Sequence, residues 1–191
     1  MDINQNLIKT VDLLLIKKEI HVRELSRFLK ISPTTASSLL NKLYKNKVLD
    51  INIKGKNKVY NLNKNNLDLI AIVEKSRLLD LFKDFRIKKI LDDVLKDLDL
   101  KFIHSLLVFG SYADFTSSKR SDLDLFFIID NKKYVNNIKK TLMKIEKRYN
   151  KEINGKFILL KEFNKEDNLI KEIIDKHVII YGVDNFLYLI R

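Results

Sequence analysis

Two acidic residues, Asp122 and Asp124, are the part of this sequence best suited to do chemistry. Only Leu123 separates them, and an apolar run from Leu125 to Ile129 follows. Side chains two residues apart on a β-strand point to the same face, so a strand here would project both carboxylates together. Such a pair repels unless a cation lies between its members, and Mg²⁺ or Mn²⁺ prefers oxygen ligands. The spacing therefore predicts a divalent-metal site.

A glycine and a serine, Gly110 and Ser111, precede this pair at the end of the apolar run 102–109. Glycine has no Cβ, so a phosphate can approach the backbone closely, and the serine offers a hydroxyl donor. Free N–H groups at the start of a following helical turn would add to the site. We therefore expect a phosphate-binding corner between two buried strands.

The order of these residues resembles a known signature: Gly-Ser, a spacer, then Asp-x-Asp. It is the signature of the minimal nucleotidyltransferases of the DNA polymerase beta-like superfamily. The spacer of ten residues, 112–121, matches the subgroup that includes the antitoxin half of toxin–antitoxin pairs, which transfers AMP onto a partner protein. The resemblance covers about residues 101–182. It implies an α+β domain with a small mixed sheet, a bound nucleoside triphosphate with Mg²⁺, and transfer of a nucleoside monophosphate.

The resemblance also assigns roles to single residues. It makes Asp122 and Asp124 the catalytic metal ligands, and it places Gly110 and Ser111 on the β- and γ-phosphates. The family usually has an arginine after the alanine of its Gly-Ser-x-Ala segment, where this chain has Asp114. Two basic residues before the acidic pair, Lys119 and Arg120, could supply that charge to the triphosphate; an exposed basic loop is the alternative.

A third carboxylate, which active members carry on the next strand, is the second departure. The aligned position here is Asn154, which can coordinate a metal through its carbonyl but cannot accept a proton. Glu152 lies two residues earlier and would substitute for it after a shift of register. Because the third carboxylate helps to deprotonate the attacking hydroxyl, its absence would lower the rate.

The N-terminal third of the chain predicts a DNA-reading module. Two short helices, about residues 4–18 and from His21, precede Ser32-Pro33, which is a good N-cap followed by proline at the first helical position. The third helix extends to about Asn46. Its outer face is small or basic, which suits contact with the major groove: Thr34, Thr35, Ser37, Ser38, Asn41, Lys42 and Lys45.

A β-hairpin follows over about residues 48–62, and its turn carries Lys54, Lys56 and Lys58. A basic hairpin beside such a helix resembles the wing of a winged helix-turn-helix domain, as in many small transcriptional regulators. The resemblance covers about residues 1–63 and implies binding to double-stranded DNA. Winged helices also serve as protein-docking or dimerisation modules, which is the alternative.

The distribution of charge favours DNA as the partner. The chain of 191 residues has a net charge of +12, and residues 1–66 contain 13 basic against 5 acidic residues, whereas the rest contains 24 and 20. An excess of positive charge suggests an anionic partner. A lysine-rich composition imposed by coding bias is the other explanation.

The sequence therefore predicts three segments: a winged helix over 1–66, a helical connector over 67–100, and a nucleotidyltransferase domain over 101–191. The connector has helical periodicity with neither glycine nor proline to interrupt it. A long amphipathic helix beside a winged helix is often a dimer seam, so we expect a homodimer. Packing of this helix on its own domains is equally compatible.

Composition excludes other kinds of protein. There is no cysteine, hence no disulfide scaffold, thiolate nucleophile or cysteine-based zinc site. The three histidines lie far apart, and Ser111 lacks the elbow motif of a serine nucleophile. The longest uncharged stretch is too short to span a bilayer. We expect a soluble, cytoplasmic protein.

Two functions fit this sequence. The first is a Mg²⁺-dependent enzyme that transfers a nucleoside monophosphate, AMP from ATP, to a protein acceptor such as a toxin-like partner. The second is a transcriptional regulator whose transferase domain senses nucleotide or is inactive. Asn154 favours the second function, and the intact Gly-Ser and Asp-x-Asp motifs favour the first.

Overall fold

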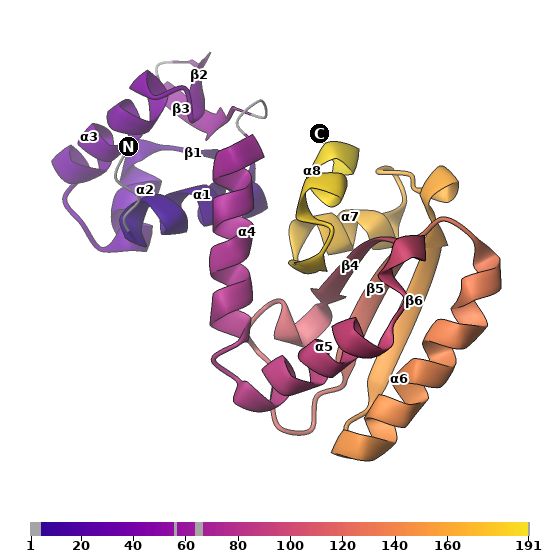
Figure 1. Ribbon diagram of the computed structural model, residues 1–191. Coiled ribbons are helices and arrows are strands. Elements are labelled where there is room, and N and C mark those ends of the chain that lie inside the picture. Colours follow the sequence, from indigo (N-terminus) through magenta and orange to yellow (C-terminus); the bar gives the residue numbers. More distant parts are fainter. Residues whose placement is uncertain (1–4, 56, 64–66, 191) are drawn as a thin grey trace. The chain divides into compact units, whose positions relative to one another are not determined.

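The structure of the protein is a computed structural model that describes residues 5–55, 57–63 and 67–190. Contacts between residues divide the chain into two units, Met1–Val73 and Glu74–Arg191. In Figure 1 the first is drawn in indigo to magenta and the second in magenta to yellow. We refer to them as the N-terminal and C-terminal units and describe each by itself.

The N-terminal unit combines helices with a small antiparallel sheet. Its elements are α1 (Gln5–Lys17), β1 (Glu19–Ile20), α2 (Val22–Leu29), α3 (Pro33–Lys45), β2 (Leu49–Lys54) and β3 (Asn57–Leu62). The strands described pair in the order β1-β3-β2. The core contains one apolar face of each helix, and fully buried side chains such as Leu25 and Leu40 belong to it.

The start of α3 confirms a local prediction. The Ser32 hydroxyl accepts a hydrogen bond from the backbone N–H of Thr35 at 3.0 Å, and Pro33 follows as the first helical residue. The β2–β3 hairpin also forms as expected, with Asp50 opposite Asn61 and Lys54 opposite Asn57. One of its three predicted lysines, Lys56, lies outside the described residues.

The C-terminal unit is an α+β fold with a mixed sheet. Its helices and strands are α5 (Phe85–Asp97), β4 (Ile103–Phe109), β5 (Leu123–Ile129), α6 (Val135–Tyr149), β6 (Ile153–Leu159), α7 (Asn168–Asp175), β7 (Val178–Tyr181) and α8 (Val183–Ile190). The sheet order is β6-β5-β4-β7. β5 and β6 are parallel, and the other pairs are antiparallel. This agrees with the α+β domain and small mixed sheet that the resemblance implies.

The segment expected to be one connecting helix is instead two helices, α4 (Leu67–Leu81) and α5. Asp84 interrupts the helical segment. Its carboxylate accepts hydrogen bonds from the N–H groups of Arg86 and Ile87 and so caps the start of α5. One face of α5, including the fully buried Ile90 and Val94, packs into the core of the C-terminal unit. Residues 85–97 are therefore part of that unit rather than a connector.

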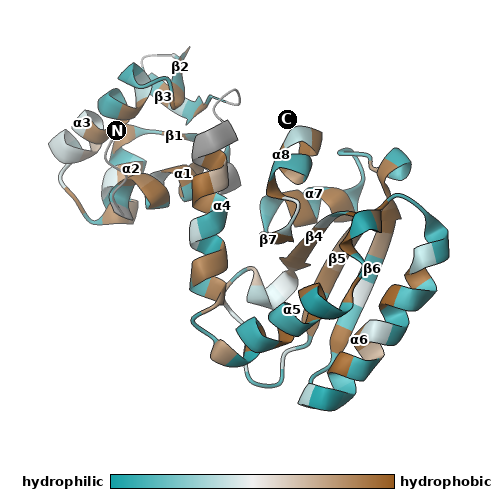
Figure 2. Cartoon of the chain, in the orientation of Figure 1, coloured by the Kyte–Doolittle hydropathy of each residue, from teal (hydrophilic) through white to brown (hydrophobic). Residues whose placement is uncertain are grey.

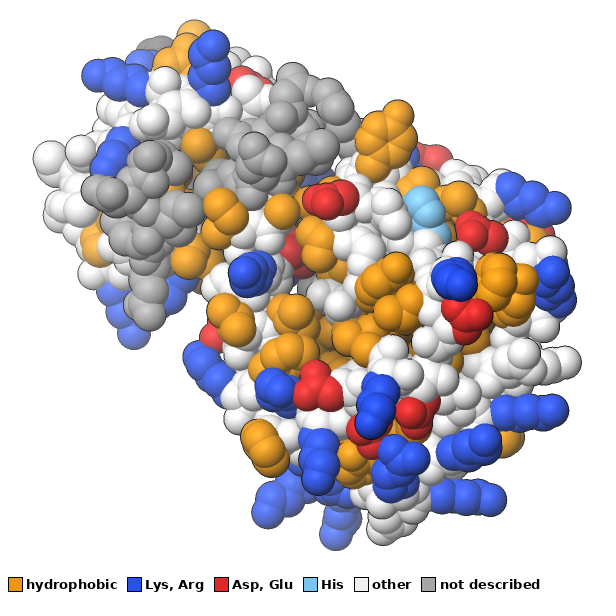
Figure 3. Space-filling model, viewed as in Figure 1, with side chains coloured by type: hydrophobic (Ala, Val, Ile, Leu, Met, Phe, Trp, Pro, Cys, Tyr) orange, Lys and Arg blue, Asp and Glu red, His pale blue; other side chains and the backbone are white. Residues whose placement is uncertain are grey.

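The strands β4 and β5 form the centre of the C-terminal core. Almost every residue of these two strands is buried, and both appear brown in Figure 2. Side chains of α5 and α6 share one core with alternate residues of β5, such as Leu125 and Phe127. Figure 3 shows one face of the surface, where charged side chains lie among apolar ones. No helix in the described parts of the chain has the length and apolar character to cross a membrane.

A buried cluster of polar and charged side chains joins the middle of α4 to the segment before β7. His177 is 4% exposed, and its Nε2 lies 3.6 Å from the carboxylate of Glu74, which also faces the Arg77 guanidinium at 3.5 Å. His177 Nδ1 faces the carbonyl oxygens of Ile173 and Ile174 at 2.9 and 3.0 Å. Burial and, to a smaller extent, the positive charge of Arg77 together lower the pKa of His177 from 6.5 to about 3.

This cluster makes stability depend on pH. The unfolded chain binds a proton at His177 near pH 6.5, whereas the folded protein binds it only near pH 3. The free energy of unfolding should therefore fall as the pH drops from 6.5 to 3, by up to about 1.4 kcal/mol per pH unit. Urea denaturation of His177→Gln should show a shallower loss over this range. Equal slopes for the wild-type protein and His177→Gln would contradict the prediction.

Candidate functional site

The edge of the sheet where β4 ends and β5 begins brings the predicted site residues together. Phe109, the last residue of β4, is opposite Asp124 in the antiparallel register. Gly110 follows Phe109, and Asp122 directly precedes β5. Leu123 is fully buried, whereas Asp122 and Asp124 on either side of it are half-buried. Burial therefore alternates along Asp122, Leu123 and Asp124, as the sequence predicts.

Gly110 and Asp124 are in close contact. A Cβ atom on Gly110 would come within 2.7 Å of Asp124 Oδ2, and the backbone of Gly110 has a φ of +67°, which side chains other than glycine rarely adopt. The residues after it form a compact turn, in which the N–H of Asp114 donates to the Gly110 carbonyl and that of Thr116 to the Ser111 carbonyl. Glycine is thus required both by conformation and by the space that the carboxylate occupies.

Asn154 lies next to both carboxylates. The parallel pairing of β5 and β6 places Asn154 in register with Asp124. Its Nδ2 donates to Asp124 Oδ1 at 3.3 Å and to Asp122 Oδ2 at 3.5 Å. The amide N–H groups therefore provide partial positive charge between two negative groups. This is the position at which the resemblance described from the sequence expects a third carboxylate.

Glu152 adds negative charge beside the pair. The negative charge of Asp122 raises the pKa of Glu152 above its usual range, and desolvation and a hydrogen bond with Asp122 raise it further. The Glu152 carbonyl accepts a hydrogen bond from Leu123 N–H at 2.9 Å. Even so, no three Asp, Glu or His side chains converge as a metal centre within the described ranges. The ligands that the geometry offers are Asp122 and Asp124, with Asn154 beside them.

These donors suit a hard divalent cation. Two carboxylates supply anionic oxygens, and Mg²⁺ characteristically completes its coordination with water and substrate phosphates. A cation would also relieve the repulsion that raises the pKa of Glu152. The residues present therefore fit a metal held by Asp122 and Asp124.

Comparison with known proteins identifies the family of the C-terminal unit. The family model described as "Polymerase beta, Nucleotidyltransferase" matches residues 86–186, which is more than half of the chain. The chain belongs to this nucleotidyltransferase family. The match begins in α5, in agreement with the packing of that helix in the C-terminal core.

The other comparisons are less informative. A search of curated proteins found no match. Among solved structures, one chain of "Crystal structure of the toxin-antitoxin with AMP-PNP" is 16% identical to this protein. The alignment covers 68% of this chain and 82% of that chain, with a TM-score of 0.37.

The structure of this nucleotidyltransferase also places the residues at which it departs from the family pattern. Asp114, where the resemblance leads us to expect arginine, forms an ion pair with Lys176 at 3.0 Å. Lys119 and Arg120 are exposed in the turn before Asp122, and neither forms an ion pair with any described residue. That turn is held by hydrogen bonds between Ser118 and Ser121.

Two lysines near the site were missed by sequence reasoning. Lys156 is on the exposed face of β6, two residues after Asn154, and its ammonium lies 5.4 Å from the centre of the Phe109 ring. Glu152, Asn154 and Lys156 occupy every second position of the sequence, and this period of two could have predicted that Lys156 shares a strand face with Asn154. Lys151 is buried and donates to the Ser121 carbonyl, with its ammonium 5.0 Å from the Tyr112 ring centre. No sequence pattern marks it, because both contacts are long-range.

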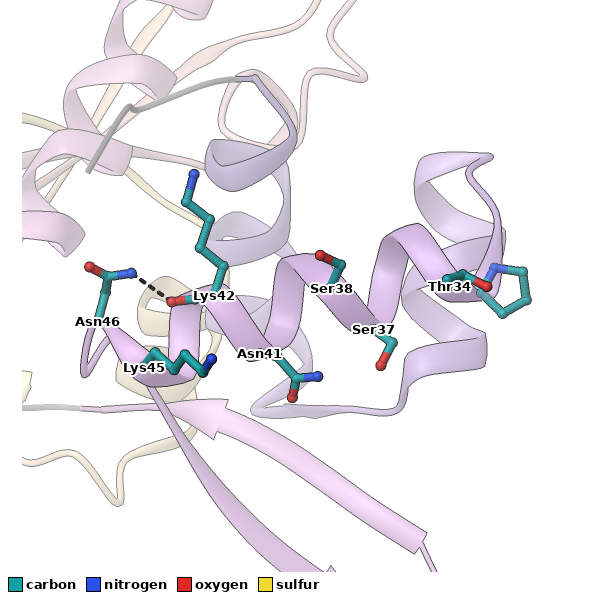
Figure 4. Close-up of a pocket in the computed structure, with 8 residues that line it drawn as sticks. Thr34, Ser37, Ser38, Asn41, Lys42, Lys45 and Asn46 are labelled. Atoms are coloured by element: carbon teal, nitrogen blue, oxygen red, sulfur yellow. Dashed lines mark hydrogen bonds between the residues drawn. The ribbon is translucent and has the colours of Figure 1, made fainter.

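A groove along α3 gathers most of the predicted DNA-binding residues of the N-terminal unit. It measures about 850 Å³, and in Figure 4 Ser38 and Lys42 project to one edge of the helix while Ser37 and Asn41 project to the other. Its lining consists of Pro33, Thr34, Ser37, Ser38, Asn41, Lys42, Lys45 and Asn46. Thr35 is not in the lining; its hydroxyl lies 2.8 Å from the Ser32 hydroxyl in the helix cap. Asn41 Oδ1 accepts a hydrogen bond from the Tyr60 hydroxyl of β3.

The hairpin lysines have different surroundings. Lys54 pairs with Glu19 of β1 at 2.7 Å, so its charge is partly neutralised. Lys58 lines a second groove together with residues of α2, where Arg23 and Arg27 add basic side chains. Sequence reasoning missed these two arginines; their exposed positions on α2 were the available signal.

Proposed function

We propose that this chain is a DNA-binding enzyme that transfers AMP from ATP to a protein acceptor with the help of Mg²⁺. The observation that carries the proposal is the contact between Gly110 and the Asp124 carboxylate, where the buried strand β4 ends and the buried strand β5 begins. Family membership of residues 86–186 supports nucleotidyl transfer as the type of reaction.

In this proposal each residue at the sheet edge has a defined task. Gly110 and Ser111 bind the β- and γ-phosphates through the backbone and the serine hydroxyl, and Asp122 and Asp124 hold Mg²⁺. The metal, when bound, stabilises the charge that develops on the phosphates. A hydroxyl of the acceptor attacks the α-phosphorus in line, the bond to the β-phosphate oxygen breaks, and pyrophosphate leaves. The acceptor proton passes to solvent or to Glu152, since Asn154 cannot accept it.

Lys156 is the most suitable cation to meet the triphosphate. It is exposed, it lies on the same face of β6 as Asn154, and the Phe109 ring beneath it places its ammonium near the end of β4. Lys119 and Arg120 remain further candidates for this task, because they precede Asp122 without an ion pair to another described residue.

Incubation with α-³²P-labelled ATP, Mg²⁺ and candidate acceptor proteins tests the enzyme. We expect label on the acceptor and release of pyrophosphate. The enzymatic function would be contradicted if no label reached any acceptor and DNA binding changed when ATP was added.

A regulator with a nucleotide-sensing transferase domain is the second candidate, and Asn154 is the observation in its favour. Without the third carboxylate, nucleotide could bind at Gly110 and Asp124 and change DNA affinity without reaction. If the protein is a regulator, we expect DNA binding that depends on ATP and no release of pyrophosphate. If it is an enzyme, we expect release of pyrophosphate.

The N-terminal unit supplies DNA binding in this proposal, as a winged helix with α3 as the recognition helix and the β2–β3 hairpin as the wing. The small and amide side chains of the α3 groove fit contact with base edges, and Lys42 and Lys45 fit contact with phosphates. The apolar face of α5 packs within the C-terminal core and is not available for a dimer contact. A homodimer would therefore form through α4, on which Leu79 is 60% exposed.

Salt dependence provides a test of the α3 assignment. Replacing Lys42 and Lys45 with glutamine should weaken binding to duplex DNA for all sequences and reduce the slope of log K against log salt by about 2. Fluorescence anisotropy at several salt concentrations measures both quantities.

Replacing Lys54 and Lys58 in the hairpin should reduce the slope less, because Glu19 already partly neutralises Lys54. Glutamine at Lys9 and Lys30, exposed lysines outside both grooves, is the matched control. An unchanged slope for the α3 variant would contradict its role as recognition helix.

A further inference from the structure

The positive charge of the C-terminal unit is concentrated on one segment. Residues 132–151, which contain α6 and its flanks, have eight basic residues and one acidic residue. The other residues of the range 74–191 have 16 basic and 18 acidic residues. The whole excess of positive charge in this unit therefore comes from α6 and its flanks. A uniform lysine-rich composition would not produce such a concentration.

Three lysines on α6 form a line along the helix, which we call the α6 lysine stripe: Lys140, Lys144 and Lys147. Spacings of four and three residues place them on one face, about 6 and 4.5 Å apart along the axis. The buried residues of α6, such as Leu142 and Ile145, occupy the opposite face. The stripe is exposed, and blue side chains project from the edge of the unit where α6 lies (Figure 3).

The stripe has no neutralising partner, unlike the charges around it. None of its three ammonium groups forms an ion pair or hydrogen bond with another described residue. Nearby, Lys132 pairs with Glu162 and Arg148 with Asp93. On the adjacent α5, Lys88 pairs with Asp92 one turn away. Like charges one turn apart destabilise a helix by a few tenths of a kcal/mol, so the stripe is unfavourable unless it serves binding.

We propose that the α6 lysine stripe binds the phosphate backbone of a nucleic-acid duplex, as a second contact surface separate from α3. Lysine is depleted in protein–protein interfaces, which use aromatic and apolar anchors. The exposed side of α6 offers a single large apolar side chain among its described residues, Met143. Regularly spaced lysines without aromatic anchors instead match phosphate contacts, which carry no sequence information.

The experiment uses the full chain with Lys42→Gln and Lys45→Gln as background, so that α3 no longer contributes its lysines. Anisotropy titrations with labelled duplex DNA, and with duplex RNA in a second arm, give the salt slope. Replacing the three stripe lysines with glutamine should reduce the slope by about 3, since each phosphate contact contributes about 1. Replacing them with arginine should preserve the slope, which separates loss of charge from misfolding.

The matched control changes the same amount of charge elsewhere on the unit. Lys101, Lys161 and Lys165 are exposed and lie outside α6, so their replacement with glutamine should leave the slope unchanged. An equal loss in this control would show a diffuse effect of net charge and overturn the proposal. Displacement of the duplex by poly-L-glutamate at equal charge concentration would point to an acidic protein instead and would also overturn it. Because α3 is altered in every sample, these outcomes do not depend on the function proposed for the N-terminal unit.

Discussion

Replacement of Asp124 with asparagine is expected to reduce nucleotidyl transfer by about 1,000-fold. Asp124 is the carboxylate that contacts Gly110 and is in register with Asn154, so it lies at the centre of the site. Loss of its charge removes one of the two anionic metal ligands. Metal ions contribute several kcal/mol to stabilisation of such a transition state, and about 4 kcal/mol corresponds to 1,000-fold. Single-turnover transfer of label from ATP measures the effect.

Asp130→Asn is the matched control for this variant. Asp130 is exposed and directly follows β5 at its other end, so the substitution makes the same change of charge away from the site. It should retain wild-type transfer. Transfer that persists in Asp124→Asn, or that is lost equally in Asp130→Asn, would contradict the assignment of the site.

Local interactions account for the parts of this protein that the sequence predicts well. The cap at Ser32 depends on a residue three positions away, and the hairpin depends on the alternation of neighbouring residues. The site pair was predictable for the same reason, since the side chains of Asp122 and Asp124 need only an extended backbone around Leu123 to share a face. Gly110 was predictable as a close approach, although the atom that approaches it in the structure is a carboxylate oxygen.

Features that depend on distant parts of the chain were not predictable. The packing of α5 in the C-terminal core depends on residues far along the chain, so helical periodicity through residues 67–98 could not show it. The Asp84 cap is local, like that of Ser32, but the continuous periodicity obscured it. The pairing of Lys54 with Glu19 depends on β1 joining the sheet, and β1 consists of only two residues. The contacts of Lys151 likewise join segments 30 or more residues apart.

Asn154→Asp tests whether the departure from the family pattern limits the rate. The substitution places a third carboxylate in register with Asp124, where it can hold metal and accept the proton of the attacking hydroxyl. General base catalysis contributes about 100-fold or more, so transfer should rise by about 100-fold. Without Mg²⁺ the added charge should destabilise the protein, because the amide that donates to both carboxylates is replaced by a repelling group. With Mg²⁺ the stability should recover.

Thermal unfolding with and without Mg²⁺ separates the interpretations, with Asn164→Asp as a control that adds the same charge at an exposed position. If Mg²⁺ stabilises Asn154→Asp more than the control and transfer rises, the natural protein is an enzyme slowed by its asparagine. Stabilisation by Mg²⁺ without any transfer, in the variant or in the natural protein, favours a nucleotide sensor. If Mg²⁺ affects both variants equally, the carboxylates do not form a metal site. The asparagine is informative because it is the one position at this sheet edge where the two functions require different chemistry.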